Sequence, residues 1–259
     1  MKNLNIVDEN FLQISSDENL LLTGQNNFLH IYVEENIQVQ IFIFNAEINF
    51  LECKILKNSV VNLDFISLNE KKNITKFDLQ EGAQLNLKII STKKITEETI
   101  VNLNEENSKF HGQYLVLAKN SNNCISTKIF HNAPKTFSDI ANFGISLTEG
   151  NINFETTGKV AKGKSKSLCK QFTRGIILAE NADIIAQPIL LMEEFDVQAH
   201  HGVAIGKISY DELFYLMSRG LTEKKSEQLI ISSLLEPFLE TLLEENLKQK
   251  ISNSIYSLL

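Results

Sequence analysis

The chain has 259 residues and a mass of 29.4 kDa, with 43% hydrophobic and 22% charged residues, so it can bury a substantial core. Its formal net charge of −7 argues against nucleic acid as a partner, because binding to phosphates requires a basic face. No stretch reaches the roughly 18 uninterrupted apolar residues of a membrane span.

The three cysteines, Cys53, Cys124 and Cys169, are far apart and form no C-x-x-C pair. This spacing excludes a disulfide framework and a zinc knuckle. The first residues, MKNLNIVDEN, are polar and lack the apolar core of a signal peptide. The sequence therefore predicts a cytoplasmic protein without a membrane partner.

Short alternating segments recur from about Asn27 to about Lys207, among them IQVQIFIF, VVNLDFISL and AQLNLKII. Ile, Val, Phe and Thr at alternate positions are typical of half-buried strands. Polar turns separate the strands, for example at Glu34–Asn36, Lys57–Ser59 and Glu81–Ala83. The first turns recur roughly every 22–25 residues and the later ones more closely, which is the repeat of a β-solenoid.

Turns of the Asn-Gly or Asp-Gly type are absent, which disfavours a meander of tight hairpins. We therefore predict a mainly β fold, a right-handed parallel β-helix followed by a small α-helical domain, with an irregular β-sandwich as the alternative. The predicted boundaries are an N-terminal segment at 1–26, a β-helix core at 27–207 and a C-terminal helical domain at 208–259.

The pattern changes to helical after Lys207. Ser209 is the predicted N-cap, with Glu212 completing a capping box, and Gly220 is the predicted stop. A second helix is expected from Thr222, with Leu229, Ile230, Ser233 and Leu234 on one side.

A third helix is expected with Pro237 in its first turn. A helical domain of roughly 50 residues is too small for a secure core of its own. We expect it to pack on the end of the solenoid, on a partner, or on both.

Four residues, Gly158, Gly163, Lys164 and Ser165, satisfy the phosphate-binding pattern G-x-x-x-x-G-K-[ST]. Such a loop needs a helix after it, because the N–H groups of the helix N-terminus bind the phosphates. Here the pattern lies within a long strand-only region, where its lysines fit the solvent-facing positions of an alternating strand. We interpret it as a chance match and predict no nucleotide site.

The stretch AENADIIAQPILLMEEFDVQAHHGVAIGKISYDELFYLMSRGL, residues 179–221, resembles the C-terminal signature of the SufB/SufD family. These proteins are the β-helical scaffold subunits of the SUF iron–sulfur cluster assembly system. The matching positions are Pro188, Asp196, His201, Gly202, Leu213, Phe214, Tyr215, Leu216, Ser218, Arg219 and Gly220. The detailed match covers about the last 100 residues. The preceding solenoid resembles the family only in its general pattern of strands and turns.

Within the family the chain resembles SufD. SufB carries a cysteine 28 residues before its histidine, where this chain has Thr173, and a glutamate where this chain has Gly202. Two departures from SufD are Ala199, where a cysteine is frequent, and the expected lack of the helical N-terminal domain.

The resemblance implies a scaffold and not an enzyme. It implies a SufC-type ATPase bound to the C-terminal helices, and a SufB-like or identical subunit bound through the β-helix. No cofactor is expected to be tightly bound, while an iron–sulfur cluster or iron would be held transiently at a subunit interface. ATP would then bind to the partner.

His200 and His201 are adjacent in a predicted strand, so their side chains point to opposite faces. A neutral imidazole is a good iron ligand, and the resemblance favours His201 as the site residue. The carboxylates Glu193, Glu194 and Asp196 could add oxygen ligands, although an acidic turn is usually just solvated.

On the helices, Leu213, Phe214 and Tyr215 are contiguous and span more than one buried stripe requires, which favours contact with a partner. Arg219, beside Gly220, either caps the carbonyls of its own helix or pairs with an acidic surface of a partner.

Cys169 is either a thiolate ligand, its pKa lowered by Lys166 and Lys170, or part of the buried packing. Two other functions stay open: a solenoid enzyme that acts on polysaccharides, and a degenerate scaffold paralogue without cluster chemistry. A heterodimer and a homodimer are equally compatible with the sequence.

Overall fold

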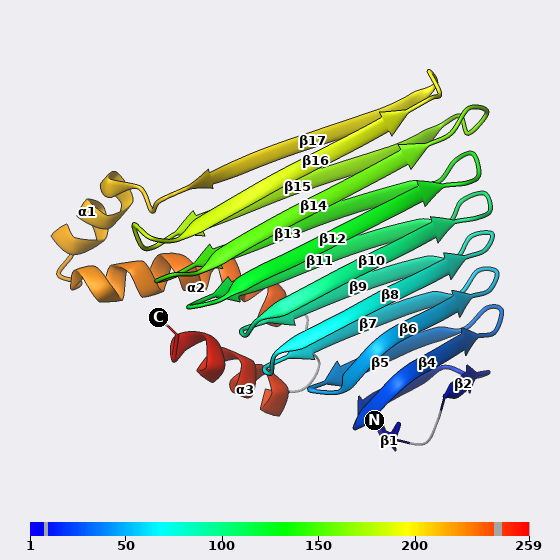
Figure 1. Ribbon diagram of the computed structural model, residues 1–259, viewed down its shortest axis with the longest axis horizontal. Helices are drawn as coiled ribbons and strands as arrows, with labels where there is room; N and C mark the ends of the chain where they lie inside the picture. The colour runs from blue at the N-terminus through cyan, green and yellow to red at the C-terminus, as the bar shows by residue number, and fades with distance from the viewer. Residues whose placement is uncertain (8–9, 241–244, 259) are drawn as a thin grey trace.

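Figure 1 shows a computed structural model of the chain, which describes residues 1–7, 10–240 and 245–258. Strands occupy most of the chain before residue 207, and helices follow. The strands are β1 Lys2–Asn5, β2 Phe11–Ile14, β3 Glu18–Thr23, β4 Gln25–Val33, β5 Gln38–Phe44, β6 Glu47–Ile55, β7 Val60–Ser67, β8 Lys71–Leu79, β9 Gln84–Ser91, β10 Ile95–Leu103, β11 Lys109–Ala118, β12 Asn122–His131, β13 Phe137–Ser146, β14 Asn151–Val160, β15 Ser167–Ile177, β16 Asp183–Met192 and β17 Val197–Gly206. The helices are α1 Tyr210–Ser218, α2 Glu223–Glu240 and α3 Glu245–Tyr256.

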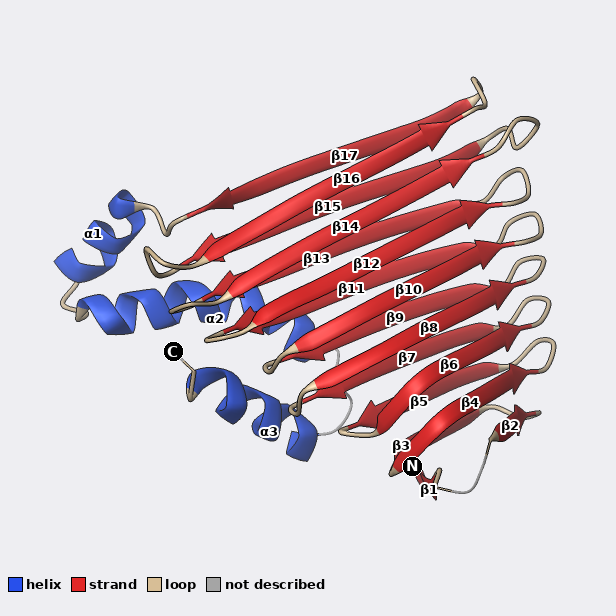
Figure 2. Ribbon diagram, viewed as in Figure 1, coloured by secondary structure: helices blue, strands red, loops and turns tan. Residues whose placement is uncertain are grey.

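The strands form two facing parallel sheets (Figure 2). Within the described residues, the odd-numbered strands make a nine-stranded sheet, the odd sheet, and the even-numbered strands make an eight-stranded sheet, the even sheet. The chain alternates between the two, so each successive coil stacks in parallel on the one before. The predicted parallel β-solenoid with C-terminal helices is confirmed.

Strands are already present before residue 27, since β1, β2 and β3 belong to the two sheets. No helix among the described residues is long and apolar enough to cross a bilayer.

Asparagines at the corners let the chain turn between sheets. Asn36, Asn58 and Asn107 have φ near +60°, a left-handed conformation that asparagine tolerates better than most residues. At the same corner of another coil, Gly82 has φ +65° and donates its N–H to the Glu106 carbonyl. The Asn-bearing corners expected from the sequence are therefore present.

The expectation that later turns recur more closely was wrong, because the coils lengthen along the chain. Asn58 donates to Asn36, 22 residues before it, whereas Thr136 and Ser167, on neighbouring later coils, are 31 residues apart. The later strands are also longer, with ten or eleven residues from β11 onward.

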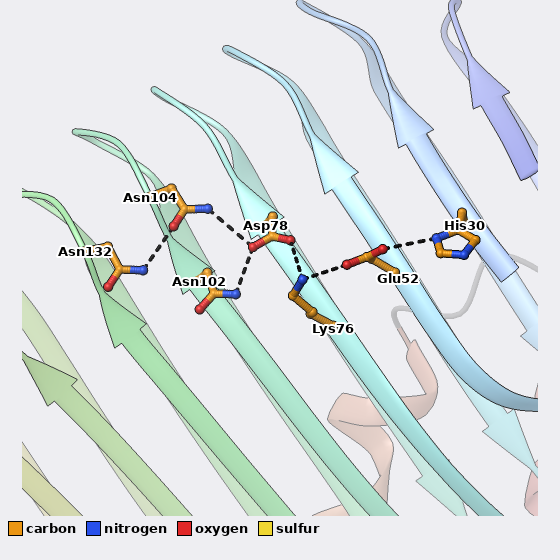
Figure 3. A network of polar contacts seen from close by, with 7 residues as sticks. All are labelled: His30, Glu52, Lys76, Asp78, Asn102, Asn104 and Asn132. Carbon is orange, nitrogen blue, oxygen red and sulfur yellow. Dashed lines mark hydrogen bonds and ion pairs between the residues drawn. The ribbon is translucent and has the colours of Figure 1, made fainter. Parts of the chain in front are cut away.

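A ladder of polar contacts crosses the outer face of the even sheet (Figure 3). Glu52 accepts from Lys76 at 2.7 Å and contacts the His30 ring at 3.1 Å. Lys76 also pairs with Asp78, which accepts from Asn102 on the next coil at 2.8 Å. Because the Glu52 and Lys76 side chains are about one-third exposed, each contact adds at most ~1 kcal/mol. Together they fix the register of neighbouring coils.

Helices α2 and α3 pack on the outer face of the odd sheet, not on the end of the solenoid as one expectation had it. The residues beneath them are apolar at outward positions, for example Phe42, Ile66 and Ile90. They form one buried cluster with Ile231, Leu235, Phe238, Leu239, Ile251 and Ile255 of the helices. Burial of apolar surface therefore directs the helices to the sheet.

The buried face of α2 also differs from the expected one. Leu229 is 50% exposed, while Ile231 and Leu235 are buried. Residue 237 lies inside α2, which continues to Glu240, so the expected third helix does not begin there.

The ends of α1 agree with the expectation only in part. Ser209 occupies the N-cap position but makes no side-chain capping bond, so no capping box forms. At the other end, Gly220 has φ +93°, and the N–H groups of Gly220 and Leu221 bind the Met217 and Leu216 carbonyls. These are the two bonds of a Schellman motif, and the predicted glycine stop is present.

Candidate functional site

The solenoid ends at β16 and β17, which lie at the far end of the stack from the N-terminus (Figure 1). Within the described chain, each of these ten-residue strands pairs on one side only, β16 with β14 and β17 with β15. We call this surface the open end. Its exposed apolar side chains are Ile185, Ile189, Leu191 and Val203.

His201 lies in the middle of β17, where it pairs with Gln171 of β15. Paired residues of neighbouring strands point to the same face, and Gln171 is buried between the sheets. The imidazole of His201 therefore points to the interior side, and it is exposed because the stack ends there. His200 pairs with Lys170 and points to the outer face.

Cys169 lies close to His201 but is fully buried. It pairs with Ala199 of β17, two residues before the histidine. Burial raises the pKa of the Cys169 thiol, which is contrary to the expectation that neighbouring lysines lower it. The side chain is part of the packing, since it touches the bare backbone of Gly158.

The acidic turn before β17 does not gather around His201. Glu194 accepts the Gly163 N–H at 2.8 Å and the Phe195 N–H at 2.9 Å, and these bonds lower its pKa. Glu193 lies 3.9 Å from the Lys159 amine. In the described part of the chain, no three His, Cys, Asp or Glu side chains are grouped so as to hold a metal ion.

The phosphate-loop pattern spans the end of β14 and the turn into β15. After Ser165 the chain enters strand β15 at Ser167, where a phosphate loop would have a helix. Gly163 has φ +82°, and its N–H is taken by Glu194. The Glu194 carboxylate holds the turn, and its negative charge would repel a phosphate bound there.

Helix α1 presents an aromatic surface to solvent. It buries no residue, and Tyr210, Phe214 and Tyr215 are each more than half exposed. The rings of Tyr210 and Phe214 stack with centroids 6.3 Å apart, and the Arg219 guanidinium lies over the Tyr215 ring at 5.3 Å. Leu213 is half-buried.

Two polar sites on the sheets were not predicted from the sequence. One is a groove of about 840 Å³ on the outer face of the even sheet, with Cys124, Glu98 and Lys128 in its lining. The other, of about 280 Å³ on the odd sheet, contains the buried pair Asp64 and Lys88. The available signal was the polar residues at outward positions of neighbouring coils. To see which of them lie side by side, one must know how many residues each coil contains.

The chain matches the family described as SUF system FeS cluster assembly, SufBD core domain, over residues 12–234. It is 33% identical over 130 residues to the iron–sulfur cluster assembly protein SufD of Bacillus subtilis, a match that covers 50% of this chain and 30% of that protein. It is 27% identical over 158 residues to the SufD protein of Escherichia coli, covering 61% of this chain and 37% of that protein.

A SufBD family protein of Pyrococcus horikoshii is 36% identical over 101 residues, covering 38% of this chain and 23% of that protein. In each of these three matches, the chain covers less than two-fifths of the relative's length. The family match extends across both sheets and into α2, and the parallel solenoid agrees with it. The chain therefore belongs to the SufB/SufD family of the SUF iron–sulfur cluster assembly system, and it is SufD-like.

Proposed function

We propose that the chain is a cytoplasmic, SufD-like scaffold component of a SUF assembly complex. Its C-terminal helices bind a SufC-type ATPase, and the open end of its solenoid binds a SufB-like or identical subunit. His201 lies near the interface where the cluster assembles. The family match over residues 12–234 is the observation that carries the proposal.

The surface of α1 supports the ATPase contact. Phe214 is 61% exposed and Tyr215 57% exposed, although aromatic side chains of this size are usually covered. Exposed aromatic residues beside an arginine are typical of the residues that dominate binding at interfaces. The Arg219–Tyr215 contact restricts the orientation of both exposed side chains, which lowers the entropy lost when a partner binds them.

The open end supports the contact with a second solenoid. An unpaired strand presents a row of free N–H and C=O groups that another strand can pair with. In β17 this edge is ten residues long. Pro188 lies on β16, where the missing N–H of proline is tolerated because the strand is at an edge.

The position of His201 supports a role at that interface. Because no metal-binding group of three side chains exists within the described residues, iron bound by His201 would need further ligands from the second subunit. Iron or a nascent cluster is then cargo held between subunits. No tightly bound cofactor of this chain is required.

The phosphate-loop pattern and the β-solenoid are compatible with other functions, but the structure favours them less. The N–H of Gly163 is occupied by Glu194, which would repel a phosphate. A polysaccharide-active enzyme would use carboxylates about 5–10 Å apart in one groove. The outer groove of the even sheet is lined by Glu97, Glu98 and Glu155, but Glu97 is buried and Lys128 pairs with Glu98 at 2.7 Å.

The ATPase contact is tested by co-purification of the SUF ATPase of the same organism with the full chain and with a chain truncated after Ser209. We expect the ATPase to be retained by the full chain and lost on truncation. The double variant Phe214→Ala/Tyr215→Ala should weaken binding at least tenfold. Phe28→Ala, at a position that is 56% exposed on the solenoid, is the matched control and should bind as the wild type. Retention of the ATPase by the truncated chain would refute this contact.

The role of His201 is tested in the assembled complex. His201→Ala should lower the amount of iron–sulfur cluster formed, measured by its visible absorption, while assembly of the subunits is unchanged. His200→Ala removes the neighbouring imidazole from the other face and should have no effect. Equal loss in both variants would contradict a specific role for His201.

A further inference from the structure

A column of threonines runs along the interior of the solenoid. Thr75, Thr99, Thr127 and Thr156 occupy paired positions on the consecutive strands β8, β10, β12 and β14. All four are at most 3% exposed. Their hydroxyls line the inner face of the even sheet, beside the apolar core cluster.

Polar side chains of the odd sheet face this column. Asn142 of β13 donates to both Thr156 and Thr173 at 3.1 Å, which connects the two sheets across the core. The buried hydroxyl of Tyr114 on β11 faces Thr99 and Thr127. The two rows together form an interior polar track.

The track begins at a buried pair of charged residues. The Lys71 amine lies 3.9 Å from the Glu97 carboxylate, and both side chains are at most 5% exposed. Glu97 accepts from Thr75 at 2.8 Å and from Thr99 at 3.2 Å, so the pair is joined to the first threonines of the column.

The track leads to the open end. Thr173 and Gln171 lie on the same face of β15, and Gln171 pairs with His201 at the exposed edge. Gln171 is 4% exposed, and its amide donates to the Ile189 carbonyl at 3.2 Å. Beyond it, the exposed imidazole of His201 marks the transition from the interior to solvent.

Many polar atoms on the track lack a hydrogen-bond partner of normal geometry among the described residues. They include both amide atoms of Asn73, Glu97 Oε2, Tyr114 Oη, Thr127 Oγ1, Asn142 Oδ1 and Gln171 Oε1. In native proteins nearly all buried polar atoms are satisfied, by protein or by ordered water. Atoms that follow one another along a single path need a shared partner, and water is the molecule that can donate to and accept from all of them.

We propose that the solenoid interior binds a file of water molecules along this track, from the Lys71–Glu97 pair to the open end beside His201. The waters complete the hydrogen bonds of the threonine column and of Asn142. They also give the buried pair a route for proton exchange with solvent. The inference is independent of what the chain assembles with.

The electrostatics of the pair agree with such a route. Burial lowers the pKa of Lys71 to about 7, partly offset by Glu97, and burial raises the pKa of Glu97. Lys71, Glu97 and Tyr114 are the titratable groups that face one another here, and the Phe65 ring lies against the Lys71 amine. A proton that enters or leaves this buried pair has to cross the solenoid interior, and the polar track supplies hydrogen-bonding groups along that path.

Water relaxation dispersion with ¹⁷O on the full chain tests the proposal, because it detects only long-lived internal water. We expect wild type to show a relaxation dispersion from long-lived internal water. In Thr127→Val, which removes a hydroxyl and keeps the side-chain shape, the amplitude of this dispersion should correspond to at least one water fewer. Thr96→Val, on the outer face of β10, is the matched control and should match wild type. Asn142→Leu gives the same test at a second point if Thr127→Val does not fold.

A crystal structure of the chain gives the second measurement. Ordered waters should lie about 2.7–3.2 Å from the side-chain atoms of Thr127 and Asn142. The proposal is overturned if Thr127 Oγ1 and Asn142 Oδ1 have protein partners in a dry core, or if wild type and Thr127→Val show equal dispersions.

Discussion

Asp64 shows how one buried carboxyl couples the fold to pH. It lies on the outer face of the odd sheet and is 7% exposed. Gln40 donates to it at 3.1 Å, and burial raises its pKa to about 6, against the opposing effects of Lys88 and Gln40. The folded protein therefore favours the protonated form of Asp64 more than the unfolded chain does.

We predict that Asp64→Asn alters the pH dependence of stability. The folded-state pKa is above the unfolded value of about 3.9, so the favourable contribution is complete below pH ~4 and is lost as pH rises through ~6. From pH 4 to pH 7 the variant should gain roughly 1–3 kcal/mol in unfolding free energy relative to wild type. Urea unfolding of both proteins at the two pH values measures this, and an unchanged difference would contradict it.

Gly158 is the first glycine of the phosphate-loop pattern, and its role here is packing. A Cβ at this position would overlap the Cys169 sulfur and lie 3.1 Å from the Gln171 amide nitrogen. We expect Gly158→Ala to destabilise the protein by about 1–3 kcal/mol, as overpacked cores do.

The partner variant distinguishes this explanation from a general loss of stability. Cys169→Ala removes the sulfur that the new methyl group meets, so the double variant should be less destabilised than the sum of the two single variants. Strict additivity in thermal unfolding would show that the sulfur is not the obstacle.

At the scale of elements, the helical domain depends on the odd sheet. Ile231 of α2 is 1% exposed, and Phe238 packs edge-on against Phe143 of β13 with ring centroids 4.8 Å apart. The Lys88 amine also donates to the Phe238 carbonyl at 3.3 Å. The turn of α2 that contains Phe238 is therefore held both by apolar packing and by the buried Lys88 amine.

We expect Ile231→Ala to destabilise the protein by roughly 2–4 kcal/mol, because it leaves a cavity between helix and sheet. Leu229→Ala, two residues away and half exposed, should stay within about 0.5 kcal/mol of wild type. Chemical unfolding of the two variants provides the comparison. Similar losses in both would mean that α2 packs through another face.

The elements themselves could be predicted from the sequence, because strands and corners are local signals. Asn36 and Asn58 are at corners where a left-handed residue is required, and alternation predicted the strands between them. The position of α2 could not be predicted, since Phe44, Ile66 and Ile90 form one apolar surface only when three coils are in register. The coil length sets that register, and it changes along the chain.

The candidate site was predictable only through the family resemblance. Nothing in the spacing of the sequence indicates that His201 pairs with Gln171, 30 residues before it, on the last turn of the solenoid. The interior track was hidden for the same reason, because Thr75 and Thr99 lie one coil apart. Long-range pairing is the information that periodicity alone does not supply.

At the scale of the molecule, the solenoid has two different ends. The first is closed by short strands, and Ile6 and Ile14 there are buried. The other ends in two ten-residue edges, against four residues in each of β1 and β2. This asymmetry favours assembly through β16 and β17, with α1 beside them available to a separate partner.

Native mass spectrometry of the chain co-expressed with the SUF ATPase and the SufB-like protein of the same organism tests the account most directly. We predict one complex that contains all three proteins. Val203→Lys, at a position 46% exposed on the open end, should lose the second solenoid subunit, while Val7→Lys, 52% exposed near the first strands, should keep it. A chain that remains alone, or two variants that behave alike, would contradict the account.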